Sequence, residues 1–293
     1  MKIAIIGGGF YGCYFAYKIL QLKKKHQITI FEKNKDILRE AAINNQYRLH
    51  KGFHYPRSLN TIKQTNQGFK IFSKEFKNFL YFPKKNIYAI HRNSKINFNK
   101  YLNVFKKDNF KFKILPKKKF NLYFTKPNEI EGAIVVNEAV IKLEKLYKYI
   151  RSKLKDVKIF KNTEIHKIDR NKRTISYKDK KKKFDLIINT TFTNPNLGLK
   201  KKKYKIKYEL ASMLHVKNFL NKDIALTVMD GSFGSAYPIN QNVLTLSSVK
   251  YTPFKKFKTI KNYSKFINKK NFLKKLNDHS YKILRDISKY ISK

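Results

Sequence analysis

Three glycines near the N-terminus have the spacing that allows a backbone turn to hold a pyrophosphate. Gly7, Gly9 and Gly12 follow the pattern G-x-G-x-x-G. The first glycine permits a tight turn, the second lets the anion approach the backbone, and the third lets a helix pack close to a strand. Glu32 lies 20 residues after Gly12, where a carboxylate can accept hydrogen bonds from both hydroxyls of a ribose and would repel a 2′-phosphate. These residues indicate binding of a dinucleotide without that phosphate.

A second group of residues, between positions 48 and 57, concentrates the side chains that catalysis uses. Two of the seven histidines, His50 and His54, lie there with Tyr55 and Arg57. A histidine titrates near neutral pH and can transfer a proton. Arg57 can hold a carboxylate, and Arg48 offers the same chemistry. The alternative is that both histidines hydrogen-bond a structural loop, with Arg57 paired to an acid.

The glycines need a strand before them and a helix after them, and the sequence provides both. Residues 2–6 are a short apolar run typical of a strand buried on both faces. Residues 10–22 have helical periodicity and residues 27–31 predict a second strand that ends at Glu32. The next buried strand comes only at residues 185–191. An NAD domain would continue at once with another β–α unit, so this interruption favours FAD and an inserted second domain, with NAD as the alternative.

Hydrophobic periodicity predicts the remaining elements. Helices are expected over residues 59–80 and 137–154 and in the tail, 262–293; strands over 86–91, 111–115, 121–125, 157–160, 224–229 and 243–249; and a hairpin over 164–168 and 174–177. The lysine runs 117–119, 180–183 and 200–203 are expected to be solvated loops.

The formal net charge of +48 suggests a polyanion-binding protein, but the composition favours another explanation. Only 8 of the 67 Lys and Arg residues are arginine, whereas phosphate and base readers rely on arginine. Abundant Lys, Asn, Ile, Phe and Tyr indicate A/T-rich codons. With 42% hydrophobic residues, the chain can build a core. Nucleic-acid or other polyanion binding is kept as an alternative function.

The sequence also limits compartment and cofactor class. Cys13 is the single cysteine, so no intrachain disulfide can form, and a packing role is expected for it. No apolar stretch approaches the ~20 residues of a membrane span, and no signal peptide is indicated, so a cytoplasmic location is expected. No metal-ligand spacing is present. The expected partner is a small-molecule substrate, and the oligomeric state is left open.

Several segments together resemble the D-amino-acid oxidase-like family of FAD-dependent oxidoreductases. IAIIGGGFYGCYFAYKI and ITIFEKN match its dinucleotide signature, and AAINNQYRLHKGFHYPRS (41–58) is similar to the loop that lies beside the flavin. EGAIVVNEAVIKLEKL (131–146), NTEIHKI (162–168) and FDLIINTT (184–191) resemble the return into the FAD domain. MDGSFGSAYPINQNVLTLSSVKYTP (229–253) resembles the substrate-domain sheet of flavoproteins encoded beside surface-polysaccharide genes. Family members usually continue with a glycine-containing segment that covers the flavin, whereas no glycine follows Gly234 here.

The resemblance implies an α/β fold with a Rossmann-like FAD-binding domain and an inserted, mainly antiparallel β-sheet substrate domain. The FAD-binding domain is expected to comprise 1–80, 126–200 and 254–293, and the substrate domain 81–125 and 201–253. The implied function is hydride transfer to FAD from a small amine, amino acid or sugar-derived substrate. Candidate catalytic residues are His50, His54, Tyr55, Arg57 and Tyr237. Candidate cofactor-binding residues are Gly7, Gly9, Phe10, Tyr11, Gly12, Glu32, Lys33, Asn45, Arg48, Ile165, Thr190 and Thr191.

Overall fold

The structure is a computed structural model that describes residues 1–201, 203–220 and 223–292. The chain divides into two compact units, each built from two segments. Unit 1 comprises Met1–Asn45 and Leu143–Tyr208, and unit 2 comprises Gln46–Lys142 and Glu209–Lys293. The boundaries differ from the expected domains. Residues 46–80, 126–142 and 254–293 belong to unit 2, because strand pairing and helix packing within that unit hold them, and residues 201–208 belong to unit 1.

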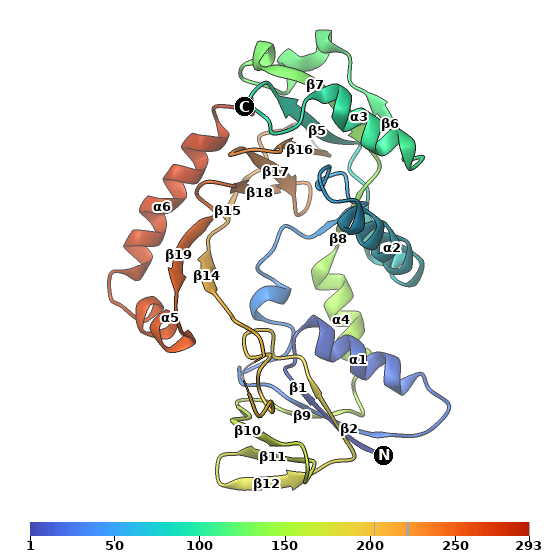
Figure 1. Ribbon diagram of the computed structural model, residues 1–293, viewed down its shortest axis with the longest axis vertical. Coiled ribbons are helices and arrows are strands. Elements are labelled where there is room, and N and C mark those ends of the chain that lie inside the picture. The colour runs from blue at the N-terminus through green and yellow to red at the C-terminus, as the bar shows by residue number, and fades with distance from the viewer. Residues whose placement is uncertain (202, 221–222, 293) are drawn as a thin grey trace. The chain divides into compact units, whose positions relative to one another are not determined.

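Unit 1 is built on a parallel sheet in the strand order β13–β1–β2–β9. Figure 1 labels three of these strands, β1, β2 and β9. The strands are β1 (Lys2–Ile6), β2 (Gln27–Phe31), β9 (Lys158–Phe160) and β13 (Leu186–Asn189). Helix α1 (Phe10–Leu20) connects β1 to β2, and α4 (Leu143–Lys153) leads into β9. The predicted β–turn–α–β opening is therefore confirmed, with β1 and β2 at the expected residues.

An antiparallel sheet completes unit 1. Its strands are β10 (Lys167–Asp169), β11 (Thr174–Tyr177) and β12 (Lys180–Lys183). The β10–β11 hairpin was expected, but the prediction of a loop over 180–183 was wrong. Those four lysines pair along the whole of β11, because a strand at the edge of a sheet can carry its charges into solvent.

Unit 2 contains a seven-stranded sheet in the order β15–β18–β17–β16–β5–β7–β6. Its pairs are antiparallel except for β16–β5, which is parallel. The strands are β5 (Lys85–His91), β6 (Phe112–Ile114), β7 (Ile130–Val136), β15 (Leu214–Lys217), β16 (Ile224–Met229), β17 (Gly234–Pro238) and β18 (Val243–Ser248).

Two helices supply apolar side chains to the cores of unit 2. Ile283 and Ile287 of α6 (Phe272–Ile287) pack with Leu226 and Leu246 in one cluster. Tyr101, Leu102 and Phe105 of α3 (Phe98–Lys107) pack with Tyr88 and Ile90 in another. Since neighbouring residues of a strand point to opposite faces, the sheet is covered on both sides.

A small sheet positions the segment that carries the candidate catalytic residues. It has the order β3–β8–β4, with β3 (Arg48–Leu49), β8 (Ala139–Ile141) and β4 (Leu80–Tyr81). The expected helix over 137–154 was therefore wrong at its start: α4 begins at Leu143 because Ala139 and Val140 pair with β3.

The rest of unit 2 is helical or peripheral. Helix α2 (Leu59–Glu75) follows the segment that carries the candidate catalytic residues. Helix α5 (Ile260–Ile267) contacts β19 (Pro253–Phe257), which pairs with β14 (Tyr208–Ala211). The strand expected over 121–125 does not form among these described residues. A 3₁₀ helix covers Lys117–Leu122 instead, and the side chains of Phe120, Tyr123 and Phe124, which have helical spacing, are buried in one cluster.

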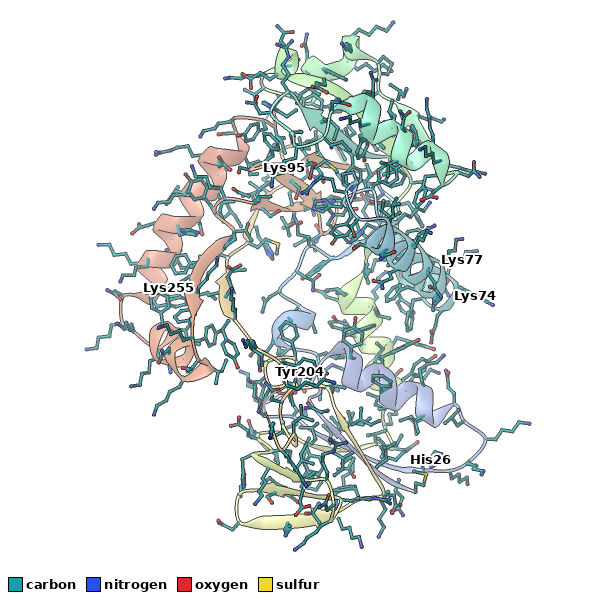
Figure 2. The ribbon with its side chains drawn as sticks, in the orientation of Figure 1. His26, Lys74, Lys77, Lys95, Tyr204 and Lys255 are labelled. Atoms are coloured by element: carbon teal, nitrogen blue, oxygen red, sulfur yellow. The ribbon has the colours of Figure 1, made fainter. Side chains whose placement is uncertain are left out.

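The surface is rich in lysine, as the composition requires. Lys74 and Lys77, near the end of α2, are exposed and project outward (Figure 2). No helix within the described ranges is long and apolar enough to span a bilayer.

Candidate functional site

The turn between β1 and α1 requires glycine at the first and third motif positions. Gly7 has φ +103°, a left-handed conformation that favours glycine, and its N–H donates to the Phe31 carbonyl at 2.8 Å. A Cβ atom at Gly12 would overlap the carbonyl oxygen of Gly7. A Cβ atom at Gly9, in contrast, would meet no atom within 4 Å. The turn is therefore closed on the protein side and open at Gly9.

Helix α1 begins at this open side without a side-chain cap. Its N-cap residue is Gly9, and no side chain caps the helix there. The first N–H groups of a helix have no partner within the helix and carry a partial positive charge. This combination is suited to binding a phosphate.

Glu32 holds the turn from the end of β2. Its Oε2 accepts from the N–H of Gly8 at 2.7 Å and its Oε1 accepts from the N–H of Asn34 at 2.8 Å. The residue is buried. Two carboxylate oxygens offer about four acceptor positions, so these two hydrogen bonds leave acceptor capacity at the turn. The structure thus brings Glu32 to the glycine motif, as the spacing suggested.

Thr190 also lies at the turn, although it follows β13 in the second segment of unit 1. Its Oγ1 is 2.8 Å from the Gly7 carbonyl oxygen and 2.9 Å from that of Ile6. Thr191 instead bonds to Asn189 through its own hydroxyl. Ile165 is buried in an apolar cluster with Ile6. A residue 183 positions after Gly7 therefore completes the glycine turn.

The other candidate cofactor residues of unit 1 surround the turn more loosely. The ring of Phe10 stacks on that of Tyr14 with centroids 5.8 Å apart. Tyr11 and Lys33 are exposed, and the side chain of Asn45 donates to the carbonyls of Ala41 and Ala42. Burial raises the pKa of Cys13 to about 12, which fits the expected packing role.

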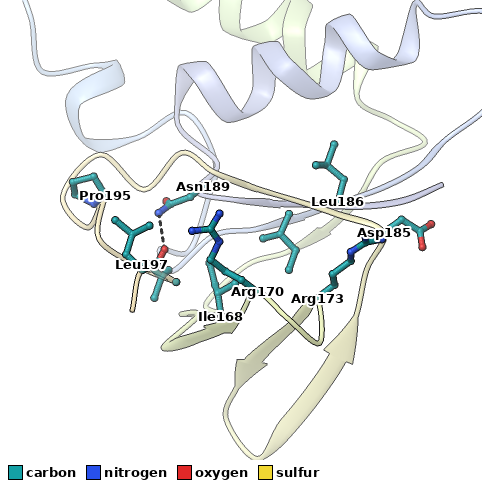
Figure 3. A pocket seen from close by; sticks show the side chains of 11 residues that line it. Ile168, Arg170, Arg173, Asp185, Leu186, Asn189, Pro195 and Leu197 are labelled. Carbon is teal, nitrogen blue, oxygen red and sulfur yellow. Dashed lines mark hydrogen bonds between the residues drawn. The ribbon is translucent and has the colours of Figure 1, made fainter. Parts of the chain in front are cut away.

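Unit 1 also contains an open pocket that sequence analysis did not predict. Its volume is about 330 Å³, and it lies along β13 (Figure 3). Its walls include Ile168, Leu186 and Leu197, with Arg170 and Arg173 contributing positive charge. Nothing in the spacing of these residues could have indicated a pocket, because it forms between the β10–β11 hairpin and the loop after β13.

In unit 2, the histidines lie in the chain segment just after β3. The ring centroid of Tyr55 is 5.6 Å from that of His50 and 5.4 Å from that of His54. Burial, with a smaller effect of the Arg48 cation, lowers the pKa of His50 to about 4 and that of His54 to about 3. Both imidazoles are therefore neutral at pH 7, and the expected titration near neutral pH does not occur. Their Nδ1 atoms are buried with no hydrogen-bond partner in the described part of the chain.

Arg48, expected to bind the cofactor, belongs to a hydrogen-bond network inside unit 2. Its Nη2 donates to the hydroxyls of Tyr88 at 3.1 Å and Thr227 at 3.0 Å. The guanidinium carbon lies 4.3 Å from the centroid of the Tyr237 ring, in cation–π geometry. Its Nε atom is buried without a partner among the described residues.

The network rests on a row of polar side chains that crosses four strands. Tyr88, Thr227, Ser235 and Ser247 are successive register partners on β5, β16, β17 and β18. Gln46 donates to Ser235 and to Thr245, each at 3.2 Å. Sequence reasoning missed this row, because strand register depends on pairing between distant segments.

Glu138, immediately before β8, was also missed. It is completely buried, and its Oε2 accepts from the Tyr88 hydroxyl at 2.7 Å while Oε1 accepts from the backbone N–H of Lys51 at 2.6 Å. Burial raises the pKa of Glu138. The only sequence signal was a single acid within the apolar run VVNEAVI.

Arg57 and Tyr237 have partners of their own. Arg57 pairs with Asp230, with Nε 2.9 Å from Oδ1, and its side chain is 57% exposed. This is the pairing considered as the structural alternative. Tyr237 is fully buried and accepts a hydrogen bond from the side chain of Asn86 at 2.8 Å. Burial raises the pKa of Tyr237 to about 12, so its hydroxyl stays protonated.

No cluster of three or more metal-ligating side chains occurs within residues 1–201, 203–220 and 223–292.

Comparison with known proteins gives a family match that covers most of the chain. The family model described as "FAD dependent oxidoreductase" matches residues 2–237. The FAD-dependent monooxygenase FPY4 of Fusarium mangiferae is 30% identical over 266 residues, which are 88% of this chain and 66% of FPY4. The chain thus spans just under two thirds of the length of that relative.

Solved structures of oxidases have the same fold. Glycine oxidase from Bacillus cereus is 14% identical, with a TM-score of 0.65, over 99% of this chain and 78% of that one. L-α-glycerophosphate oxidase from Mycoplasma pneumoniae, solved with FAD bound, is 21% identical, with a TM-score of 0.62, over 85% of this chain and 71% of that one. At these identities the likeness concerns the fold.

Proposed function

This chain belongs to the family of FAD-dependent oxidoreductases, and we propose that it oxidises a small amine, amino acid or sugar-derived molecule by hydride transfer. The observation that carries the proposal is the glycine turn: it is open at Gly9, uncapped at the start of α1, and held by Glu32. When bound, FAD supplies the hydride-accepting chemistry.

The residues of unit 1 fit the dinucleotide. The N–H groups at the start of α1 are free of side-chain caps and would bind the pyrophosphate. Glu32 keeps acceptor capacity for ribose hydroxyls. Gly7 and Gly12 allow the turn that presents these groups, and Thr190 supports it from β13.

The residues of unit 2 supply a polar surface for the substrate. His50 and His54 are neutral, so they offer hydrogen-bonding nitrogens rather than positive charge. A base acts best when its pKa is near the working pH, so these histidines are suited to orienting a substrate. Tyr55, exposed and with its ring near both imidazoles, would contact the same molecule. Arg57 and Tyr237 stay candidates for orienting it as well.

A second candidate is oxygen insertion by a monooxygenase. The 30% sequence identity to FPY4, whose name describes a monooxygenase, favours this reaction class. Both reactions use FAD, but their electrons come from different sources. In the oxidation the substrate reduces the flavin, whereas in the monooxygenase reaction a nicotinamide reductant reduces it, one oxygen atom of O₂ enters the organic product and the other leaves as water.

The test is reduction of the protein-bound flavin without oxygen. The protein is purified with FAD and mixed anaerobically with panels of amines, amino acids and amino or hydroxy sugars, and the flavin absorbance is followed. One class should bleach the spectrum faster than it bleaches free FAD, which is the control. If FAD binds and no class bleaches it, hydride transfer from these substrates is wrong. Labelled O₂, added with NADH or NADPH as the reductant, then tests the monooxygenase alternative: label in the organic product supports it.

A further inference from the structure

The geometry points to Glu138 as a positioning residue that holds the segment of Arg48, His50 and His54 in place through Tyr88 and the backbone of Lys51. This inference deepens the proposed function and rests on it, since that function gives the histidines contact with the substrate. Glu138 itself is completely buried and is argued to act through these neighbours.

Both carboxylate oxygens of Glu138 accept hydrogen bonds, one from the segment itself and the other from the main sheet. Oε1 accepts from the Lys51 N–H at 2.6 Å, next to His50 in the chain. Oε2 accepts from the Tyr88 hydroxyl at 2.7 Å, and that hydroxyl accepts from Arg48 at 3.1 Å. Within the residues that the structure describes, Arg48 and Glu138 form no direct ion pair. The hydroxyl of Tyr88 therefore connects the cation to the buried carboxylate.

The local fold gives Glu138 this place. It immediately precedes β8, where Ala139 pairs with Leu49 and Val140 with Arg48. Tyr88 comes from β5, and its ring contacts Phe53 and His54, with centroids 6.0 and 6.4 Å apart. The side chain of Glu138, which precedes β8, thus connects the segment after β3 to the main sheet at β5.

Replacing the carboxylate disturbs this arrangement even when its shape is kept. In Glu138→Gln, the amide places an oxygen at one of the two positions and an NH₂ group at the other. Either the Lys51 N–H or the Tyr88 O–H therefore loses its acceptor. A buried donor that loses its acceptor destabilises the protein far more than an exposed donor does, because water can accept from the exposed one. Arg48 also loses the buried negative charge connected to it, and the segment would open to water to solvate the cation.

The experiment follows the histidines directly. Protein with FAD bound is labelled at its histidine rings, and NMR follows each ring from pH 3 to 8 after assignment with His50→Gln and His54→Gln. In Glu138→Gln, the titration midpoints of His50 and His54 should rise by about one pH unit or more, because the segment becomes hydrated and desolvation is the main cause of their low values. Buried His91, bonded to Glu129, reports that the fold is intact.

The matched control is Glu131→Gln. Glu131 lies on β7 and likewise accepts from a backbone N–H, that of Phe98 at 2.8 Å, but it serves helix α3. Its replacement should leave His50 and His54 unchanged. Unchanged midpoints in Glu138→Gln with an intact His91 signal, or an equal rise in Glu131→Gln, overturn the proposal.

If Glu138→Gln does not fold, Tyr88→Phe tests the same connection by removing one oxygen atom. It should raise the two midpoints in the same direction, and by less, because the Lys51 bond persists. No rise in Tyr88→Phe overturns the inference. This readout needs no substrate, so the positioning role can fail while substrate oxidation succeeds, and the reverse.

Discussion

The neutral histidines of unit 2 make stability depend on pH. Their native pKa values, about 4 for His50 and about 3 for His54, lie below the ~6.5 of an unfolded histidine. Between pH ~6.5 and these native values, the unfolded chain therefore binds more protons than the native protein. The stabilisation that each neutral histidine contributes is complete above pH ~6.5 and is lost as the pH falls towards 4 for His50 and 3 for His54. Each histidine contributes a slope of up to about 1.4 kcal/mol per pH unit.

The double variant His50→Gln, His54→Gln should flatten the stability profile between pH 6.5 and 4, measured by urea unfolding at each pH. The comparison is of slopes, because the substitutions also change absolute stability. His215→Gln, at an exposed position on β15, is the control and should keep the wild-type slope. An unchanged slope in the double variant would mean that these imidazoles are hydrated in the native protein.

Among the elements, the β1–α1 turn gives a sharp test of glycine. In Gly12→Ala, the new Cβ would overlap the carbonyl oxygen of Gly7, so helix and strand must separate. A cost of about 1–3 kcal/mol is expected from such overpacking, with weakened FAD binding because the helix start moves. Thermal unfolding and FAD titration measure both effects.

Gly68→Ala is the matched control, since Gly68 lies inside α2 and a Cβ there meets nothing within 4 Å. It should leave FAD binding unchanged and stabilise the protein by about 0.5–1 kcal/mol, the usual gain for alanine in a helix. Equal FAD affinity in the wild type and Gly12→Ala would contradict the role of this turn.

The same elements show what sequence can and cannot predict. The glycine turn, β1 and β2 were predicted because their signals are local: an apolar run, a glycine spacing and a helical period. Ala139–Ile141 was assigned to a helix because its apolar residues continue the pattern of α4, while pairing with β3 and β4 decides its structure. The lysines of β12 have no alternation to detect. Glu138 and Tyr88 are 50 residues apart, so their contact depends on tertiary structure.

At the scale of the whole molecule, the formal charge of +48 is the largest feature that the fold does not explain. Like charges repel most in the compact state. Ion pairs such as Asp36 with Arg151 and Lys161 offset this locally; the hydrogen bond from Arg151 is the main cause that holds the pKa of Asp36 well below its usual range. With 19 acidic residues against 67 basic ones, most lysines have no acidic partner available.

Salt should therefore stabilise this protein. Raising NaCl from 0.05 to 0.5 M shortens the screening length from roughly 14 Å to about 4 Å, which weakens repulsion between exposed lysines. A gain on the order of 1 kcal/mol corresponds to about 2 °C or more in the unfolding temperature for a chain of this size. Differential scanning fluorimetry at fixed pH measures it, with sucrose at matched osmolality as the uncharged control. A melting temperature that falls with NaCl would show that attractive pairs dominate the surface.

The affinity of the protein for DNA, measured over the same NaCl series, tests the alternative function of polyanion binding. Binding of lysines to phosphate must weaken steeply as the salt concentration rises.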